Sequence, residues 1–474
     1  GRGKERDIGL YMREFDAKRT LLIYGSDRIK KDGLFDAVVA SLKENGIEFI
    51  ELGGIISNPV LSKVYEGIEL ARKFNADSVL SVGGGSCLDS AKAIAAGALY
   101  EGDVWDFFTG KDPSRALKIF DVITLAATGS EMNSGAVVTN EATKQKFSIH
   151  GDVLYPLVSV VNPQLQASVS REYLAYSAAD VIAHSIEGYF TASVQPSIIN
   201  LYIEANIKTV MKTTEILLAG PDNYDARAEF AWAATMALNG LTYVGTHGYS
   251  YPNHMLEHAM SAVVNCAHGA GLAVIMPAWM KWYKSRNLSA FERFAREIFG
   301  ASSADEGIAA FKAWLSKIGA PVSLKAVGIE GETLDEVVNL AYDYAANWRK
   351  DKLYTKENIK AIFETMNTQP IEGYLASSVT LYQNSATPWK VSSNKTEVAL
   401  SLDMLGSHSQ QWNFNLPESE INRLKSKAGF EKLFGGGCLT GRTASGNSIV
   451  SLCFSKEGKI HSILMGNNPS VFAN

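Results

Sequence analysis

Histidines and one aspartate carry the strongest chemical signal in the sequence. Six of the eight histidines fall between positions 150 and 268, and three of them, His254, His258 and His268, lie within fifteen residues. Asp180 and His184 stand four positions apart, as do His254 and His258. On a helix this spacing places both side chains on one face, with about 5–6 Å between their Cβ atoms.

A metal site is the chemistry that this group suits. Asp180 and His184, with two of the three later histidines, offer one carboxylate and three imidazoles, which suits iron(II) or zinc. The remaining histidine then lies near the ion without binding it. A single histidine is more often structural, and we interpret His150 and His247 in that way.

A glycine-rich turn, Gly83-Gly84-Gly85-Ser86, joins an apolar run to an alanine-rich helical stretch that holds Asp89 and Lys92. Glycines lack the Cβ atoms that keep a diphosphate from the backbone, and a helix N-terminus offers free N–H groups and a favourable dipole. We predict a phosphate site here. The turn is not G-x-G-x-x-G, and a merely tight turn is the alternative.

A second turn, residues 124–131, again places hydroxyl groups and small residues after an apolar run. Thr124 and Thr128 suit a phosphate or a ribose. An ordinary strand-to-helix connection capped by Ser130 explains the same residues equally well.

The elements that must position these residues follow from apolar periodicity. Between residues 19 and 161 apolar runs alternate with amphipathic stretches, as in βαβ units of a parallel sheet. We predict strands over 19–24, 48–52 and 78–82, and helices over 34–45 and 61–74. After Pro163 helical spacing dominates, with helices predicted over 172–190, 197–218 and 222–241.

The last part of the chain has a different pattern. Beyond residue 365, period-two alternation at 397–402 and 448–454 predicts strands, and an amphipathic stretch at 418–434 predicts a helix. We therefore predict an α/β protein in three parts. They are a doubly wound parallel-sheet dinucleotide-binding domain (1–163), an all-helical metal-binding catalytic domain (164–364) and an appended small α+β domain of unknown function (365–474).

Composition excludes several classes of protein. The net charge of −5 is small for 474 residues, and without blocks of like charge neither a nucleic-acid partner nor an anionic membrane is expected. Four cysteines without C-x-x-C spacing indicate a reducing, cytoplasmic setting. We find no apolar run long enough for a membrane span and no N-terminal signal segment.

In order and spacing these motifs resemble the iron-containing alcohol dehydrogenase family, in its branch of butanol-dehydrogenase-like enzymes and broad-specificity aldehyde reductases. The resemblance covers about residues 1–364 and rests on the segments 83–92, 124–131, 162–163, 179–184 and 254–269. It implies an active-site cleft between the two domains. It also implies the metal ligands Asp180, His184, His254 and His268. His258 is left as a catalytic non-ligand beside substrate and nicotinamide, suited to proton relay.

The reaction that the resemblance implies is the interconversion of primary, butanol-like alcohols and aldehydes, with hydride passing to or from the C4 atom of NADP or NAD. One divalent ion, iron(II) or zinc, polarises the substrate oxygen. The alternatives are a polyol (glycerol-type) dehydrogenase or a metal-dependent cyclisation on the same fold. A third is an idle enzyme body that serves as scaffold for a C-terminal binding module.

A preference for NADP is expected from the turn after the first strand. Ser26 stands where NAD-preferring relatives carry a carboxylate, and Arg28 or Lys144 can pair with a 2′-phosphate. An alignment shifted by one residue puts Asp27 there instead, which repels the phosphate. The full set of predicted cofactor-binding residues is Gly25, Ser26, Arg28, Gly83, Gly84, Gly85, Ser86, Asp89, Thr124, Thr128 and Lys144.

The chain departs from the family at both ends. Family members begin with a further β-strand segment, so we expect an N-terminally trimmed enzyme, and the expected homodimer depends on that segment. Residues 365–474 resemble no family that we can name. We expect either a passive fusion partner that begins near Met366 or a module that binds a protein or peptide.

Overall fold

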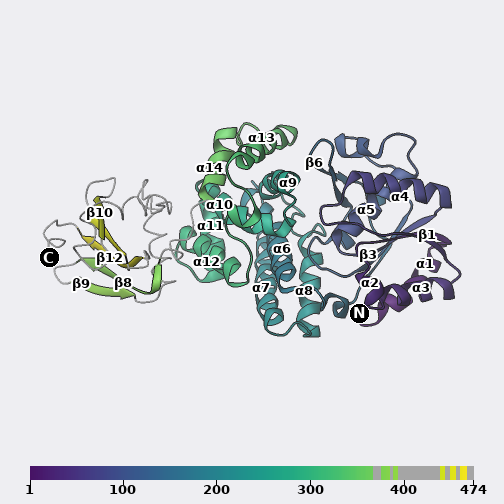
Figure 1. Ribbon diagram of the computed structural model, residues 1–474, viewed down its shortest axis with the longest axis horizontal. Helices are drawn as coiled ribbons and strands as arrows, with labels where there is room; N and C mark the ends of the chain where they lie inside the picture. Colours follow the sequence, from purple (N-terminus) through teal and green to yellow (C-terminus); the bar gives the residue numbers. More distant parts are fainter. Residues whose placement is uncertain (367–374, 385–387, 393–437, 443–448, 455–459, 467–474) are drawn as a thin grey trace.

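The computed structural model describes residues 1–366 and the strand segments 375–384, 388–392, 438–442, 449–454 and 460–466. A five-stranded sheet of order β2-β1-β3-β4-β7 forms the N-terminal part (Figure 1), and every neighbouring pair of strands is parallel. Its strands are β1 (Arg19–Tyr24), β2 (Glu48–Leu52), β3 (Ser78–Gly83), β4 (Lys118–Ile123) and β7 (Val158–Val161). The predicted doubly wound α/β domain is confirmed, and only the third predicted strand differs, by one residue.

Helices cover both faces of this sheet, and β1 explains why. Its side chains alternate between the faces: Leu21 and Ile23 pack into one core, whereas Leu22 and Tyr24 pack into the other. Because both faces are buried, the strand is apolar throughout rather than alternating. Helices α4 and α5 lie on one side of the sheet in Figure 1, and α1 and α3 on the other. The helices are α1 (Ile8–Glu14), α2 (Arg28–Lys31), α3 (Leu34–Glu44), α4 (Leu61–Phe74) and α5 (Gly85–Ala98).

An antiparallel hairpin that we did not predict follows β4. It consists of β5 (Gly135–Asn140) and β6 (Gln145–His150) and forms a sheet of its own. The hairpin contacts the helical part of the chain, where the backbone N–H of Lys146 donates to Oη of Tyr344 at 2.8 Å. It thereby joins the two parts of the chain.

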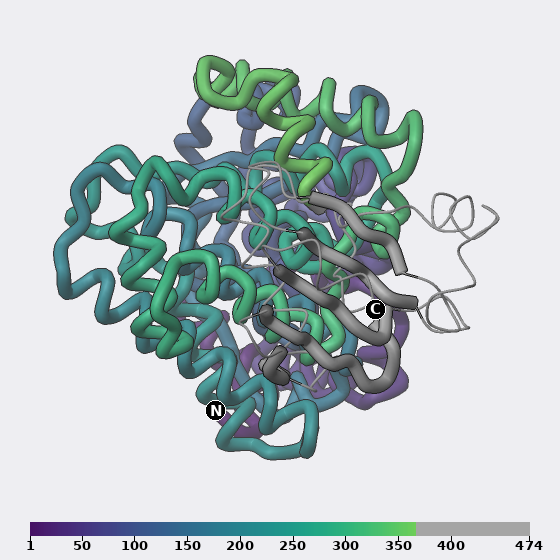
Figure 2. Tube along the Cα trace, turned by 90° about the vertical axis from the view of Figure 1, so that its left-hand side faces the viewer, coloured from purple at the N-terminus to yellow at the C-terminus, as the bar shows by residue number. Residues whose placement is uncertain are grey.

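The second part of the chain is helical, as predicted, and Figure 2 shows its teal and green helices in front of the purple N-terminal residues. The helix predicted over 222–241 ends at Ala237, because the chain turns away near Gly240, whose φ is 102°. The helices are α6 (Arg171–Thr191), α7 (Ser197–Ala219), α8 (Tyr224–Ala237), α9 (Pro252–Val264), α10 (His268–Tyr283), α11 (Leu288–Phe294), α12 (Ala304–Lys317), α13 (Glu332–Asn347) and α14 (Lys356–Met366).

The described strands of the last part form a separate sheet of order β10-β11-β12-β8-β9. The strand predicted at 448–454 is present as β11, whereas the stretches at 397–402 and 418–434 lie outside the described residues. The strands are β8 (Leu375–Asn384), β9 (Pro388–Ser392), β10 (Cys438–Arg442), β11 (Ile449–Phe454) and β12 (Ile460–Gly466). Among the helices of the described residues, none has the length and apolar character that crossing a membrane requires.

Candidate metal centre and cofactor cleft

Three helices bring the predicted metal ligands together. α6 carries Asp180 and His184, α9 carries His254 in its first turn, and α10 begins at His268. Gly269 allows the first turn of α10 to contact the backbone of α6 directly, because a Cβ atom there would lie only 2.1 Å from the carbonyl oxygen of Tyr176. This close approach places the His268 side chain beside Asp180.

The four side chains converge on one carboxylate oxygen. Atom Oδ1 of Asp180 lies 3.6 Å from Nε2 of His184, 3.7 Å from Nε2 of His254 and 3.6 Å from Nε2 of His268. These distances exceed those of a normal hydrogen bond. In the described part of the chain, the buried Oδ1 of Asp180 and Nε2 of His254 have no hydrogen-bond partner. Buried oxygen and nitrogen atoms that lack a hydrogen-bond partner and face a common point are suited to bind a cation. One carboxylate and three imidazoles are ligands that iron(II) and zinc accept.

The protonation of two of these histidines differs. Burial lowers the pKa of His184 to about 3, so that its ring is neutral as a metal ligand requires. Burial opposes the shift at His254, but the nearby carboxylates of Asp180 and Glu187 raise its pKa to about 9. Its partners therefore favour positive charge at the position where we place a cation.

Two glutamates that we did not predict orient these rings. Oε1 of Glu187 lies 2.9 Å from Nδ1 of His254, and Oε2 of Glu257 contacts Nδ1 of His268. Both glutamates are fully buried. A carboxylate on Nδ1 fixes the tautomer that leaves Nε2 free to bind a metal. Each glutamate stands three residues after a candidate ligand, Glu187 after His184 and Glu257 after His254, and this spacing on one helix face was the signal that could have identified them.

A second grouping, Glu257, His258 and His268, also has ligand atoms close enough to share an ion. Lys146 makes this grouping a poor cation site. Its buried Nζ lies 3.4 Å from Oε2 of Glu257 and 3.4 Å from Nδ1 of His268. A lysine therefore already supplies the positive charge that a cation would bring to this grouping. Among the described residues, the contacts of Asp180 are to histidines and not to a lysine.

His258 lies beside the candidate metal centre. Among the described residues, its ring makes no contact with Asp180, unlike those of His184, His254 and His268. The ring centroids of His258 and His268 are 5.7 Å apart, and Trp348 packs edge-on against His258 at 6.4 Å. Burial holds the pKa of His258 well below its usual range, so that the ring is neutral. This position and charge suit the non-ligand role that the resemblance implies.

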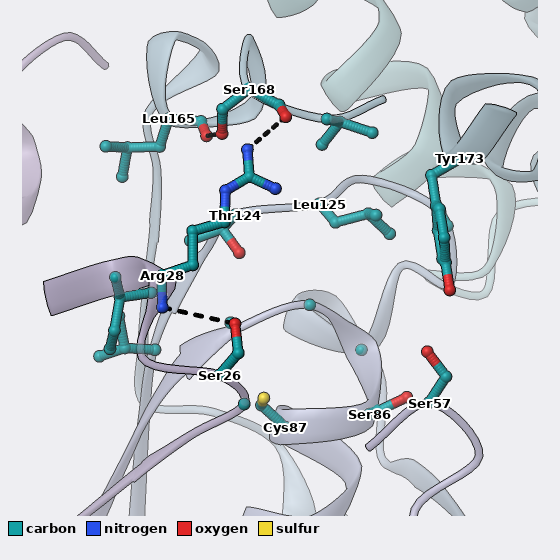
Figure 3. A pocket seen from close by; sticks show the side chains of 18 of the residues that line it. Ser26, Arg28, Ser57, Ser86, Cys87, Thr124, Leu125, Leu165, Ser168 and Tyr173 are labelled. Atoms are coloured by element: carbon teal, nitrogen blue, oxygen red, sulfur yellow. Dashed lines mark hydrogen bonds between the residues drawn. The ribbon is translucent and has the colours of Figure 1, made fainter. Parts of the chain in front are cut away.

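A cavity of about 760 Å³ runs from the first strand to the metal centre. Most predicted cofactor residues line it, and Figure 3 shows Ser26, Arg28, Ser86 and Thr124 around its walls. The glycines are needed for the close packing of this turn, because a Cβ atom on Gly85 would lie 2.5 Å from Oγ1 of Thr128. The N-terminus of α5 opens into the cavity, as a diphosphate requires. The predicted cofactor residues in its lining are Gly25, Ser26, Arg28, Gly83, Gly84, Gly85, Ser86, Thr124 and Thr128.

Two predicted cofactor residues have other contacts. Lys144 is absent from the lining of this cavity, and its Nζ pairs with Oε1 of Glu336 at 2.6 Å. Asp89 accepts hydrogen bonds from Oγ of Ser130 at 2.8 Å and from the backbone N–H of Val137 at 3.0 Å. Lys144 therefore lies away from this cavity, whereas Asp89 lines a second cavity that adjoins it. Cofactor binding by these two residues stays a prediction.

Lys92 has a structural role that its place in the motif did not reveal. Its fully buried Nζ donates to the carbonyl oxygens of Ser130, Asn133 and Gly135 at 2.7, 2.8 and 2.9 Å. It therefore holds the loop that carries Thr128 into the cleft.

A second cavity, of about 530 Å³, lies on the other side of the metal centre and is lined by His184, His254, His258 and His268. His150, which we interpreted as structural, also lines it. The two cavities meet, because they share Asn58, Gly85, Ser86, Thr128 and His268. A cofactor in the first cavity and a substrate in the second therefore come together at the candidate metal ligands.

Comparisons with known proteins agree with this arrangement. Residues 1–163 match the family model "Iron-containing alcohol dehydrogenase", and residues 174–367 match "Fe-containing alcohol dehydrogenase family, C-terminal". The chain is 36% identical over 350 residues to a probable NADH-dependent butanol dehydrogenase of Bacillus subtilis, covering 72% of this chain and 90% of that protein. It is 32% identical to the NADPH-dependent aldehyde reductase YqhD of Escherichia coli, over 67% of this chain and 84% of the relative.

A solved structure is similar over the same region. The crystal structure of NADH-dependent butanol dehydrogenase A from Thermotoga maritima superposes with a TM-score of 0.75 at 46% identity, covering 77% of this chain and 95% of the other. The chain belongs to the iron-containing alcohol dehydrogenase family. It is a metal-dependent, NAD(P)-linked alcohol dehydrogenase that acts on small-molecule alcohols and aldehydes.

Proposed function

We propose that this enzyme interconverts butanol-like primary alcohols and their aldehydes where its two cavities meet. The observation that carries the proposal is the convergence of Asp180, His184, His254 and His268 at that junction. Relatives named as butanol dehydrogenases and as an aldehyde reductase support this substrate class.

These four residues are the proposed metal ligands. When bound, the divalent ion supplies a Lewis acid that polarises the substrate oxygen. Glu187 and Glu257 hold the rings of His254 and His268 in the orientation that ligation requires.

The remaining residues position the reactants and move a proton. Gly85, Ser86 and Thr128 border both cavities, so a cofactor whose diphosphate lies at the N-terminus of α5 would direct its nicotinamide end toward the second cavity. His258, neutral and buried, is the proposed proton-relay residue.

NADP is the proposed preferred cofactor. Ser26 lines the cofactor cavity whereas Asp27 is not part of the lining, and Nζ of Lys30 lies 3.7 Å from the Asp27 carboxylate. Arg28 reaches the carbonyl of Ser168 across the cavity in Figure 3, which keeps its guanidinium near the place of a 2′-phosphate. Relatives of both cofactor types are among the matches.

A butanal-dependent assay tests the proposal. Metal-loaded enzyme is expected to oxidise NADPH when butanal is added, and chelation of the metal is expected to abolish that activity. Turnover of glycerol or 1,2-propanediol with no turnover of butanal or butanol would favour the polyol alternative instead.

We also propose the division into domains at 1–163, 164–364 and 365–474, a homodimer, and a reducing cytoplasmic setting. The described cysteines Cys87 and Cys266 are free, which fits that setting. Exposed apolar side chains at Ile198 and Leu201 offer apolar area for self-association. For residues 365–474 we propose a separate unit, a fusion partner or a binding module, with no part in catalysis.

A further inference from the structure

The loop between α8 and α9, residues 238–251, forms part of the wall of the second cavity, and its turns and hydrogen bonds fix its conformation. Three of its residues adopt left-handed backbone conformations that favour glycine: Gly240, Gly245 and Gly248, with φ of 102°, 70° and 72°. The loop is tied to the end of α6, where the backbone N–H of Ser250 donates to Oγ1 of Thr191 at 2.9 Å. Side chains that the loop points into the cavity are therefore held in place.

These side chains form a continuous series of rings that ends at the metal centre. Tyr243 and Tyr249 are stacked, with centroids 5.2 Å apart and planes at 18°. Tyr249 meets Tyr251 edge to face at 6.0 Å, and Tyr251 meets the ring of His254 in the same manner at 5.6 Å. All three tyrosines line the second cavity, and Tyr249 is 36% exposed.

Other residues of the lining leave room beside this series. The hairpin contributes the small residues Ser134, Gly135 and Ala136, and Trp348 adds a further ring beside His258. The volume of about 530 Å³ falls in the range of roughly 300–1,000 Å³ typical of pockets that enclose drug-sized ligands. A four-carbon aldehyde fills only a small part of it.

We propose that the preferred substrates carry an aromatic ring one or two carbons from the reacting carbon, and that Tyr243, Tyr249 and Tyr251 determine this specificity. The inference rests on the proposed alcohol and aldehyde chemistry and narrows its substrate class. Ring faces and ring edges attract another aromatic ring through its quadrupole, in addition to the apolar area that any hydrocarbon buries. The ring series lies outside the ligand set and binds the part of the substrate that does not react.

The test compares two aldehydes that differ in aromaticity but have the same carbon skeleton. With metal-loaded enzyme and NADPH, kcat/KM is expected to be higher for phenylacetaldehyde than for cyclohexylacetaldehyde. In a Tyr249→Leu variant, kcat/KM for phenylacetaldehyde is expected to fall about 2- to 10-fold relative to that for cyclohexylacetaldehyde, the range that aromatic contacts contribute beyond buried area. A Tyr65→Leu variant is the matched control, because Tyr65 lies on α4 and lines neither cavity.

The outcomes distinguish a failure of the aromatic specificity from a failure of the proposed alcohol and aldehyde chemistry. A wild-type enzyme that uses cyclohexylacetaldehyde as well as phenylacetaldehyde, or a variant that loses both equally with its metal content intact, overturns the aromatic specificity. Such a result leaves the proposed function standing as long as butanal is reduced. Failure to reduce any of the three aldehydes overturns the proposed function itself. If Tyr249→Leu is unstable, Tyr243→Leu provides the same comparison.

Discussion

Glu187 and His254 form a buried carboxylate–imidazole pair, with 2.9 Å between Oε1 of Glu187 and Nδ1 of His254. The same oxygen accepts the backbone N–H of His254 at 2.9 Å. Because Glu187 lies seven residues after Asp180, about two turns along α6, one helix supplies both a candidate ligand and the group that orients another. Nε2 of His254 is thereby turned toward Asp180.

Replacing Glu187 with Gln is expected to weaken metal binding about 10- to 100-fold, because the neutral amide no longer fixes the tautomer of His254 or raises its basicity. Competition with a chelator measures the affinity. Glu229→Gln, on an exposed position of α8, is the matched control and is expected to bind metal as the wild type does. Equal affinities in the two variants would show that the pair does not serve the metal.

His268→Ala is expected to lose both bound metal and turnover, since it removes one of the four side chains at the centre. His258→Ala is expected to retain metal but lose rate, by about 100-fold or more if proton relay is its role. Elemental analysis and kcat measured on the same preparations separate the two effects. A His268→Ala protein that is metal-free yet fully active contradicts the ligand assignment.

Ser26→Asp is expected to shift cofactor preference toward NADH, because a carboxylate in the cavity hydrogen-bonds the ribose 2′-hydroxyl and repels a 2′-phosphate. The ratio of kcat/KM for NADPH to that for NADH is expected to fall at least tenfold. Asp27→Ser, outside the cavity lining, is the control. A larger change in the control variant would mean that Asp27 holds the deciding position.

Lys92→Met is expected to lower the free energy of unfolding by about 3 kcal/mol or more, because it leaves three carbonyl oxygens in the protein interior without their donor. Denaturant unfolding of the metal-loaded protein measures this. The comparison is Lys118→Met, where Nζ reaches a single exposed carbonyl, that of Asp16, at 2.9 Å. Similar losses in both variants would contradict the special role of Lys92.

Deleting residues 367–474 is expected to leave metal content and the KM for cofactor unchanged. The residues that line the two cavities run from Glu5 to Trp348, and α14 ends at Met366. The deletion begins after Met366, two residues beyond the proposed domain boundary at 364, so that α14 stays intact. A soluble truncated enzyme that lost its metal would place the last part of the chain in the active site.

The sequence predicted the parts of the site that depend on local spacing. Asp180 and His184 face one way because a helix returns to the same face after four residues. The choice among the later histidines depends on how closely α10 approaches α6 at Gly269, which no local pattern reveals. The resemblance to the family, not the periodicity, selected His254 and His268.

Two lysines also show that local sequence patterns do not reveal which side chains the fold brings to the site. Lys144 precedes β6 and Lys146 lies within it, and we predicted Lys144 as a cofactor-binding residue. Lys144 lies in the hairpin turn with φ of 53° and pairs with Glu336. Lys146 is 4% exposed and reaches Glu257 at the metal centre. The difference arises from the unpredicted hairpin, because Lys144 falls in its left-handed turn whereas Lys146 falls on its second strand, against the helical part of the chain.

The three left-handed glycines of the 238–251 loop have a consequence for protein engineering. The candidate ligands lie on helices, whereas the tyrosines that line the second cavity lie on a connecting stretch, which is held by its own turns, by the end of α6 and by Val194. Grafting the corresponding loop of a relative, with the glycine positions kept, should therefore exchange the accepted substrates without rebuilding the metal centre.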